Sequence, residues 1–350
     1  MTKTQQPFAV RLLAWWDEHG RKDLPWQHPR TPYRVWISEI MLQQTQVSTV
    51  IPYFERWMES FPDVRTLAAA PLDDALSHWA GLGYYARARN LHKAARLCVS
   101  HFGGDLPATA EELCTLPGIG LSSANAIVSQ ASDRPAAVLD GNVRRVLSRH
   151  AAIEGWTGRS AVKKKLWAVA ESLLPDDRGA DYTQAIMDLG ATVCTRSKPG
   201  CGHCPIRADC TALEHGRVAE LPSPKPRIRV GERTIHMLVV RDTEDRVLLE
   251  RRPPNGVWGG LWSLPEGDSP ESVAAALGFG GDHIRALPAF EHRLSHLKLT
   301  IRPSLLVTDG PGRVQSDDQR DWFGPKALAS LGMPRPIAGL LETLNHGANK

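Results

Sequence analysis

The most informative stretch of the chain couples a glycine-rich turn to a carboxylate. The turn is Leu116-Pro117-Gly118-Ile119-Gly120, and Asp140 follows within Val138-Leu139-Asp140-Gly141-Asn142. The spacing predicts a tight hairpin between two helices and places Asp140 at the start of another helix. Backbone N–H groups at the beginning of a helix have no partner within it and can bind a phosphate. A carboxylate nearby could act on the sugar beside that phosphate, although a plain N-cap is the alternative for Asp140.

A second carboxylate lies near the N-terminus. Residues 35–42 predict an amphipathic helix, on which Glu39 and Gln43 lie one turn apart, opposite the apolar face. Gln44 would fall on the apolar face if the helix continued, so we expect a break here, with Thr45 capping the next helix. Glu39 could face a cleft, and an ordinary solvated helix carboxylate is the alternative.

Four cysteines form a C-x6-C-x2-C-x5-C run: Cys194, Cys201, Cys204 and Cys210. In a chain without a secretion signal, this run predicts a metal site rather than disulfides. Zinc and an iron–sulfur cluster both accept four cysteines, so the spacing leaves both open. Either metal centre would hold together the loop over 194–210, which also carries Arg196, Lys198 and Arg207. Cys98 and Cys114 occupy apolar helical positions and are expected to be buried.

Residues 81–89 join a flexible glycine turn to two tyrosines and two arginines. Such a mixture suits base stacking and phosphate contact. A helix start with buried tyrosines is the alternative.

The elements that carry these residues change character near residue 220. Residues 7–217 predict an almost wholly helical region, and a proline-rich basic stretch, Leu221–Pro226, then predicts a linker. Beyond it, strand patterns at 234–240, 246–250 and 296–301 precede helical patterns at 327–331 and 337–344. We therefore predict a helical domain over 1–217, a linker over 218–232 and an α+β domain over 233–350.

Charge and hydropathy limit the function classes. The net charge of +4 permits a polyanionic partner without requiring one, so a phosphate-binding surface would be local. No signal peptide and no apolar run of membrane length is evident, so we expect a cytoplasmic protein, associated with the nucleoid if it is bacterial.

Taken together, these motifs resemble the endonuclease III branch of the helix-hairpin-helix DNA glycosylase superfamily. Within that branch the chain resembles the A/G-specific adenine glycosylases, the MutY family. The region beyond the linker is similar to that family's C-terminal domain, which is related to Nudix hydrolases. The segments that carry the likeness are Leu24–Trp26, Pro32-Tyr33, Ser38-Glu39, Met41–Val47, Gly83–Tyr85 and Val257–Trp262.

The resemblance implies a fold and a set of roles. The fold is a mainly α helix-hairpin-helix glycosylase domain with an iron–sulfur cluster loop, plus a C-terminal α+β Nudix-like domain. The four cysteines would hold one 4Fe-4S cluster. Glu39 would be the general acid that protonates adenine at N7, and Asp140 would stabilise the sugar cation. Gly118 and Gly120 would contact the phosphate. Trp26, Gln43, Gln44, Tyr84, Ser122 and Asn142 would form the base pocket and DNA wedge.

Several positions refine or depart from the family pattern. Ser122 stands where bifunctional relatives carry a nucleophilic lysine, and a hydroxyl cannot form an imine. Ser295 and His296 match the lesion-reading loop, whereas Leu294 replaces a phenylalanine and Leu121 replaces a frequent basic residue. A dense Glu/Arg motif for magnesium is missing after residue 260, which indicates recognition rather than hydrolysis by the second domain.

The resemblance therefore implies a monomeric, monofunctional DNA glycosylase of base excision repair. Its substrate would be double-stranded DNA containing adenine opposite 8-oxoguanine or guanine. The alternatives are an endonuclease III-like pyrimidine glycosylase/lyase and a non-catalytic DNA-binding protein on the same scaffold.

Overall fold

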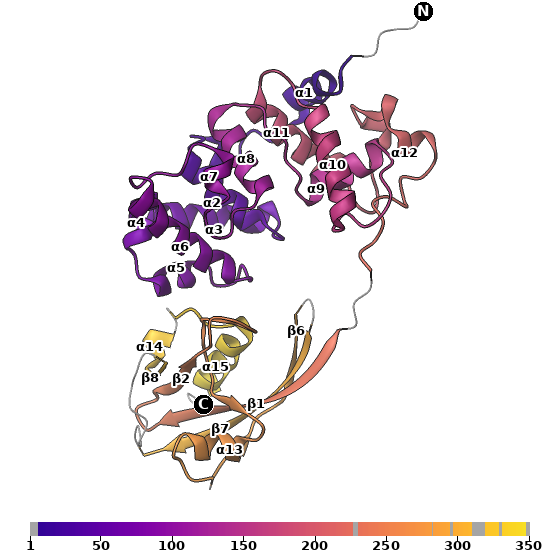
Figure 1. Ribbon diagram of the computed structural model, residues 1–350. Coiled ribbons are helices and arrows are strands. Elements are labelled where there is room, and N and C mark those ends of the chain that lie inside the picture. The colour runs from indigo at the N-terminus through magenta and orange to yellow at the C-terminus, as the bar shows by residue number, and fades with distance from the viewer. Residues whose placement is uncertain are drawn as a thin grey trace, which may run out of the picture. The chain divides into compact units, whose positions relative to one another are not determined.

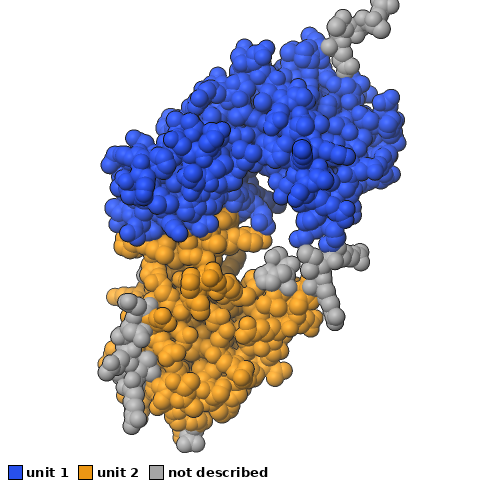
Figure 2. Space-filling model, viewed as in Figure 1, with its two compact units in different colours: residues 1–69, 90–226 blue, residues 70–89, 227–350 orange. Residues whose placement is uncertain are grey.

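The computed structural model describes residues 6–226, 230–281, 283–294, 297–309, 319–328 and 331–347. The chain forms two compact units (Figure 2). One contains residues 1–69 and 90–226, and the other contains residues 70–89 and 227–350. Among the described helices, none has the length and apolar character needed to cross a membrane. The domain boundaries that we infer from the sequence stay a prediction.

The region before residue 217 is almost wholly helical, as predicted (Figure 1). Its longer helices are α1 (Phe8–His19), α2 (Pro32–Leu42), α3 (Val47–Ser60), α6 (Ala86–His101), α8 (Leu121–Ser132), α9 (Gly141–His150), α10 (Ser160–Ser172) and α11 (Gly179–Asp188). Its shorter helices are η1 (Pro25–Gln27), α4 (Val64–Ala69), α5 (Leu72–His78), α7 (Ala110–Leu113), η2 (Leu189–Val193), η3 (Cys201–His203), η4 (Arg207–Asp209) and α12 (Thr211–Glu214).

One core of this region is built from α1, α9, α10 and α11. Leu12 of α1, Leu147 of α9 and Leu166 of α10 are fully buried in it. Such apolar residues recur at three-and-four spacing, so each helix buries one face. This packing fixes α9, whose first turn follows Asp140.

Helix α2 has clear start and stop signals. Thr31 is its N-cap and accepts a hydrogen bond from the Arg34 N–H, and Pro32 fits the first helical position. The helix ends at Leu42, and Gln44 takes a left-handed backbone with φ 60°. The predicted break between α2 and α3 is therefore confirmed.

Two local predictions were wrong. The N-cap of α3 is Gln46, whereas the Thr45 hydroxyl bonds back to the carbonyl of Gln43 at 3.4 Å. Cys98 is buried, but Cys114 is exposed. The reason is that α7 has only four residues and Cys114 is its C-cap, so the apolar spacing of a longer helix does not apply there.

The described residues after 230 form a mixed sheet and three helices (Figure 1). The strands are β1 (Gly231–Asp242), β2 (Val247–Arg251), β3 (Trp262–Ser263), β4 (Glu266–Gly267), β5 (Arg285–Ala286), β6 (Phe290–Arg293), β7 (Leu297–Thr308) and β8 (Arg320–Phe323). The helices are α13 (Pro270–Ala276), α14 (Pro325–Leu328) and α15 (Arg335–Gly347). The predicted α+β pattern is confirmed.

The sheet is centred on a long parallel pair. β1 and β7 pair from Gly231 opposite Leu297 to Asp242 opposite Thr308, within the strand order β3-β2-β1-β7-β5. Alternate residues of a strand face opposite sides. Met237 accordingly packs with Ile337 of α15, whereas Leu238 packs with Val273 of α13. The sheet thus has an apolar core on each face.

Residues 70–89 belong to the same compact unit as this sheet. The Tyr85 hydroxyl donates to the Met333 carbonyl at 3.1 Å, and Asp73 forms an ion pair with Arg251. These contacts tie the segment that carries Tyr84 into the second unit.

Candidate active site

Glu39 lies on α2 where that helix packs against α8. The residue keeps part of its surface exposed, yet burial of the carboxyl group is the main cause that raises its pKa to about 7. The charge of Asp140 raises this pKa further, and a hydrogen bond from Gln130 lowers it. Glu39 can therefore hold a proton near neutral pH while remaining open to a ligand, which is what a general acid needs.

Asp140 is the N-cap of α9, and its Oδ1 accepts the Val143 N–H at 2.7 Å. Burial raises the pKa of Asp140, whereas the N–H groups of Val143 and Asn142 and the charges of two arginines lower it. More groups stabilise the anion here than at Glu39. The pKa of Asp140 is raised overall by its burial, but the charge of Asp140 also raises the pKa of Glu39, so these contacts favour a neutral Glu39 beside an anionic Asp140.

The hairpin turn precedes α8 and exposes its backbone. Gly118 has φ 84°, and a Cβ there would lie 2.9 Å from the Cβ of Asn90, so only glycine fits without strain. Gly120 is the N-cap of α8, and a Cβ on it would meet nothing within 4 Å. The open space beside Gly120 and the unpartnered first N–H groups of α8 suit an approaching anion.

Ser122 connects the hairpin to the carboxylate. Its Oγ accepts the N–H of Leu139 at 2.9 Å, and Leu139 immediately precedes Asp140. The hydroxyl therefore holds the extended segment that leads into α9. The structure brings Glu39, Asp140, Ser122 and the hairpin together in one unit.

The other predicted pocket and wedge residues are dispersed. Trp26 of η1 is 2% exposed and its ring meets the edge of Phe54 at 5.5 Å between centroids. Gln43 is the C-cap of α2, and the neighbouring Gln44 is exposed. Their contribution to a base pocket or wedge stays a prediction.

Tyr84 belongs to the second unit. It is 52% exposed, has φ 50° and lies against the Arg87 guanidinium. An exposed aromatic side chain on a strained turn is free to stack on a base. The lesion-reading pair, Ser295 and His296, lies outside the described residues.

Sequence reasoning missed Gln130 of α8. Its side chain is 4% exposed, and its Nε2 donates to Glu39 Oε1 at 3.1 Å. The sequence does carry a sign of this contact. Gln130 follows Ile127 at helical spacing, which places its polar side chain on the buried face of the helix, where it needs a hydrogen-bond partner.

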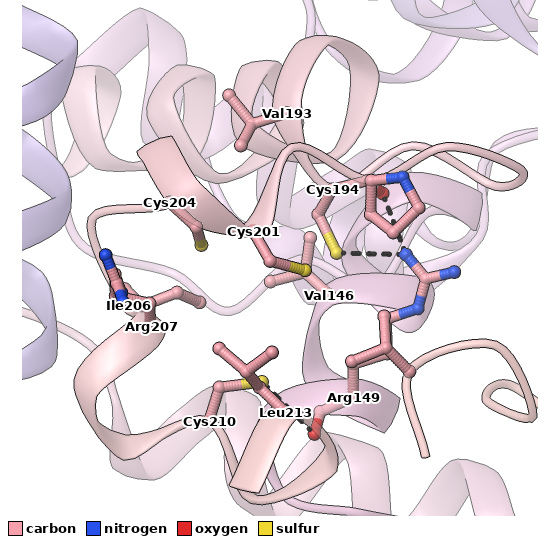
Figure 3. A pocket seen from close by; sticks show the side chains of 12 residues that line it. Val146, Arg149, Val193, Cys194, Cys201, Cys204, Ile206, Arg207, Cys210 and Leu213 are labelled. Atoms are coloured by element: carbon pink, nitrogen blue, oxygen red, sulfur yellow. Dashed lines mark hydrogen bonds between the residues drawn. The ribbon is translucent and has the colours of Figure 1, made fainter. Parts of the chain in front are cut away.

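The four cysteines line one cavity (Figure 3). Apolar side chains complete its wall, including Val146, Val193 and Leu213, and the sulfur atoms face the enclosed space. Burial, followed by the charges of the other three cysteines, raises the pKa of the Cys204 thiol to about 11.

The four thiols share one apolar-walled cavity. Across the described residues, no group of three or more His, Cys, Asp or Glu side chains is arranged as the ligands of one metal ion. Four cysteine thiolates can hold either a zinc ion or an iron–sulfur cluster, so the chemistry of these residues suits a metal centre with cysteine ligands.

Helix α9 ties the cysteine loop to the carboxylate site. Arg149 is 3% exposed and donates to the Thr195 carbonyl at 2.7 Å and to the Cys194 Sγ at 3.3 Å. Arg145 donates to the Cys194 carbonyl at 2.7 Å and to the Asn142 Oδ1 at 2.9 Å. Helix α9 therefore begins after Asp140 and, through Arg145 and Arg149, hydrogen-bonds to the loop that begins at Cys194.

Comparison with known proteins identifies this arrangement. Residues 37–172 match the HhH-GPD superfamily base excision DNA repair protein model, and residues 236–343 match the NUDIX domain model. The chain is 34% identical over 340 residues to an adenine DNA glycosylase of Buchnera aphidicola subsp. Baizongia pistaciae, covering 96% of each chain. This chain belongs to the adenine DNA glycosylase (MutY) family.

Further relatives agree on the glycosylase fold. An adenine DNA glycosylase of Mus musculus is 45% identical over 227 residues, which cover 61% of this chain and 44% of the mouse protein. A thermostable thymine-DNA glycosylase structure matches 59% of this chain and 95% of its own, with TM-score 0.54 and 28% identity. An endonuclease III–DNA complex, at TM-score 0.51 and 22% identity, shows the shared fold. The MutY-family chain is thus a DNA glycosylase of base excision repair.

Proposed function

We propose that this glycosylase hydrolyses the N-glycosidic bond of adenine opposite 8-oxoguanine or guanine in duplex DNA, acting as a monomer. The observation that carries the proposal is the pairing of Glu39, with a pKa raised to about 7, and the helix-capping Asp140. Full-length relatives named adenine DNA glycosylase support adenine as the base.

The two carboxyls divide the chemistry between them. Glu39 donates its proton to adenine N7, which makes the base a better leaving group. The C1′–N9 bond then breaks, adenine departs with the bonding electrons, and a sugar cation remains. The Asp140 anion stabilises that cation until water adds to C1′ and releases a proton. Acid catalysis of this kind contributes roughly 10² to 10⁴ in rate.

The target adenine must leave the duplex before Glu39 can reach it. Extrusion costs a few kcal/mol, which side chains that enter the vacated space offset. Gln44 and Tyr84 are exposed on left-handed backbone and serve as the wedge, while Trp26, Gln43 and Asn142 belong to the base pocket. Gly118 and Gly120 place hairpin N–H groups on a phosphate.

The Ser122 hydroxyl makes the enzyme monofunctional. It accepts the Leu139 N–H and supplies no amine for a Schiff base. Borohydride trapping to an adenine:8-oxoguanine duplex should give no appreciable covalent complex at single-turnover rates. Efficient trapping would indicate a lyase of the endonuclease III type instead.

We infer that Cys194, Cys201, Cys204 and Cys210 hold one 4Fe-4S cluster. The cluster would supply a cross-link that rigidifies the loop beyond η2. The protein as purified should contain about four iron and four sulfide per chain and absorb in the visible range. One zinc per chain and no visible absorbance would contradict this assignment.

The second unit is proposed to read the lesion. Its Ser295 and His296 would face 8-oxoguanine, with Leu294 in place of the family's aromatic residue. A double Ser295→Ala, His296→Ala variant should lose its preference for 8-oxoguanine over guanine while it still excises adenine. An unchanged preference would remove this role.

One experiment separates the functional alternatives. Excess protein is incubated with duplexes that carry adenine opposite 8-oxoguanine, guanine or thymine, and strand breaks are compared with and without alkali. We expect adenine release from the first two duplexes, visible only after alkali. Breaks without alkali would favour a lyase. Binding without release, unaffected by Glu39→Gln, would favour a non-catalytic protein.

A further inference from the structure

The buried amide of Gln130 contacts the proposed acid directly. Gln130 lies on α8 and Glu39 on α2, 91 residues apart in the chain, and Gln130 Nε2 donates to Glu39 Oε1 at 3.1 Å. The side chain of Gln130 is almost fully buried, so water does not compete for this bond. The contact therefore acts on the carboxyl group in a largely desolvated environment.

A hydrogen bond to one carboxyl oxygen distinguishes the two oxygens. The amide N–H is a donor, so the oxygen that it contacts remains an acceptor in both protonation states. The proton of neutral Glu39 is thereby directed to Oε2. A carboxyl with a fixed acceptor oxygen and a fixed O–H meets the base in one orientation rather than several.

The same bond opposes the other groups around Glu39. Burial and the anionic Asp140 at the start of α9 favour neutral Glu39, whereas the Gln130 amide favours its carboxylate. From the other elements packed against α2, namely α3 and η1, the described residues add no further group that shifts its pKa. Gln130 of α8 is thus the group that opposes the rise in the pKa of Glu39.

We propose that Gln130 is a positioning residue for the glycosylase reaction, which fixes the Glu39 carboxyl and sets the pH range in which it holds its proton. This inference rests on the proposed role of Glu39 as the acid. It predicts that losing the amide changes both the orientation and the ionisation of Glu39, whereas a packing role would change neither.

The test compares Gln130→Met, which keeps the length of the side chain but has no donor, with wild type. Single-turnover excision of adenine opposite 8-oxoguanine is followed from pH 5 to 9. We expect the alkaline limb of the Gln130→Met profile to move up by about one pH unit, because a donor to the carboxylate is lost. The plateau rate should fall roughly tenfold, because the acid is no longer fixed.

Two further variants separate the loss of the amide donor from a general weakening of helix packing. Gln130→Asn retains the amide on a shorter arm and should shift the limb in the same direction by less. Val128→Ala, on the same helix, controls for general weakening of α8 and should leave the limb unchanged. If all three variants keep the wild-type limb, or if Gln130→Met only lowers the rate at every pH, Gln130 is a packing residue and the proposal is wrong.

A second readout does not depend on activity. Carbon-13 NMR of glutamate side-chain carboxyls, with Glu39→Gln used to assign the Glu39 signal, reports its pKa in the intact protein. We expect a higher pKa for Glu39 in Gln130→Met than in wild type. An equal pKa overturns the proposal even if the enzyme excises adenine. A higher pKa in a protein that excises no adenine supports the contact and contradicts the proposed function alone.

Discussion

At the residue scale, the proposed mechanism requires two carboxyl groups that carry different charges at the same pH. Glu39 is desolvated, faces the Asp140 anion and has a single opposing hydrogen bond from Gln130. Asp140 is also desolvated, but the first turn of α9 donates two N–H bonds to it. The start of a helix further favours an anion. The different surroundings of the two groups therefore favour a protonated Glu39 and an ionised Asp140.

This separation predicts the pH dependence of excision. Glu39 is active when protonated, and its pKa is raised to about 7, so the single-turnover rate should be high below pH 7 and fall about tenfold per pH unit above it. Glu39→Gln should reduce the rate at least 10²-fold while duplex binding persists. A rate that rises through pH 7 to 9 would contradict the assignment of Glu39 as the acid.

The same shift predicts a stability effect. The pKa of Glu39 is higher in the folded protein than its ordinary value of 4.5, so the folded state binds this proton more tightly than the unfolded chain. The free energy of unfolding should therefore decrease as pH rises from about 4.5 to about 7. Urea denaturation of Glu39→Gln, which lacks the titrating group, should show a smaller decrease over that range. If the free energy of unfolding depends on pH identically in wild type and Glu39→Gln, the raised pKa of Glu39 is contradicted.

Local sequence patterns predicted some site residues and missed others for a physical reason. Asp140 could be placed at a helix start because an N-cap is decided by its own neighbours. Gln130 could not be paired with Glu39 because their contact depends on how α2 packs on α8. Cys114 was misjudged because its apolar spacing is cut short by the C-cap of α7.

At the element scale, α9 connects two features that are distant in the sequence. It begins at Asp140 and presents Arg145 and Arg149 to the loop that begins at Cys194. An arginine that satisfies several backbone carbonyls acts as a cross-link, because each carbonyl would otherwise be buried without a donor. Disturbing these arginines should therefore affect the loop before it affects the carboxylate.

Replacing Arg149 tests this link. Arg149→Ala leaves the carbonyls of Thr195 and Leu221 without their donor, so we expect the free energy of unfolding to fall by about 3 kcal/mol and the visible absorbance of the proposed cluster to be lost more readily. Thermal unfolding and visible absorbance measure the two effects. Arg159→Ala, at an exposed N-cap, is the matched control and should change stability by less than about 0.5 kcal/mol. Equal effects of the two variants would contradict the cross-link.

The hairpin yields a prediction about salt dependence. Leu121 is the first residue of α8 and is 51% exposed beside Gly120, where a basic side chain would reach a bound phosphate. Leu121→Arg should tighten duplex binding and steepen the plot of log affinity against log salt by about 0.9. Fluorescence anisotropy over a salt series measures the slope, and Leu121→Gln is the neutral control. An unchanged slope in Leu121→Arg would show that this helix start does not lie on a phosphate.

Elements could be predicted from the sequence more readily than their pairing. Helical spacing and the proline-rich stretch after residue 220 predicted an all-helical region followed by strands. The alternation in 297–301 predicted a strand, but its parallel partner β1 lies more than sixty residues earlier. Which strands pair depends on the apolar layers formed with α13 and α15, and no local pattern encodes that choice.

At the scale of the whole molecule, one chain combines a glycosylase fold with a Nudix-like fold, and we expect only the first to be catalytic. A Nudix reaction needs several carboxylate oxygens around magnesium and a pyrophosphate. Helix α13 (Pro270–Ala276) carries a single acidic residue, Glu271, and otherwise presents small or apolar side chains in its second half. Glu266 of β4 forms an ion pair with Arg252 at 2.9 Å, so this carboxylate is already engaged by a cation of the chain.

We therefore expect the intact protein to bind DNA with this domain without hydrolysing nucleotides. With millimolar magnesium and nucleoside diphosphates linked to a sugar or a second nucleoside, chromatography should detect no product above the rate without protein. Adenine excision by the same preparation shows that the protein is active. Magnesium-dependent product release that Glu266→Gln abolishes would contradict the prediction, because Glu266 would then be a ligand rather than an ion-pair partner. Magnesium-dependent product release that Glu266→Gln leaves unchanged but that a Glu271→Gln variant abolishes would contradict the prediction equally, because Glu271 of α13 would then be the ligand.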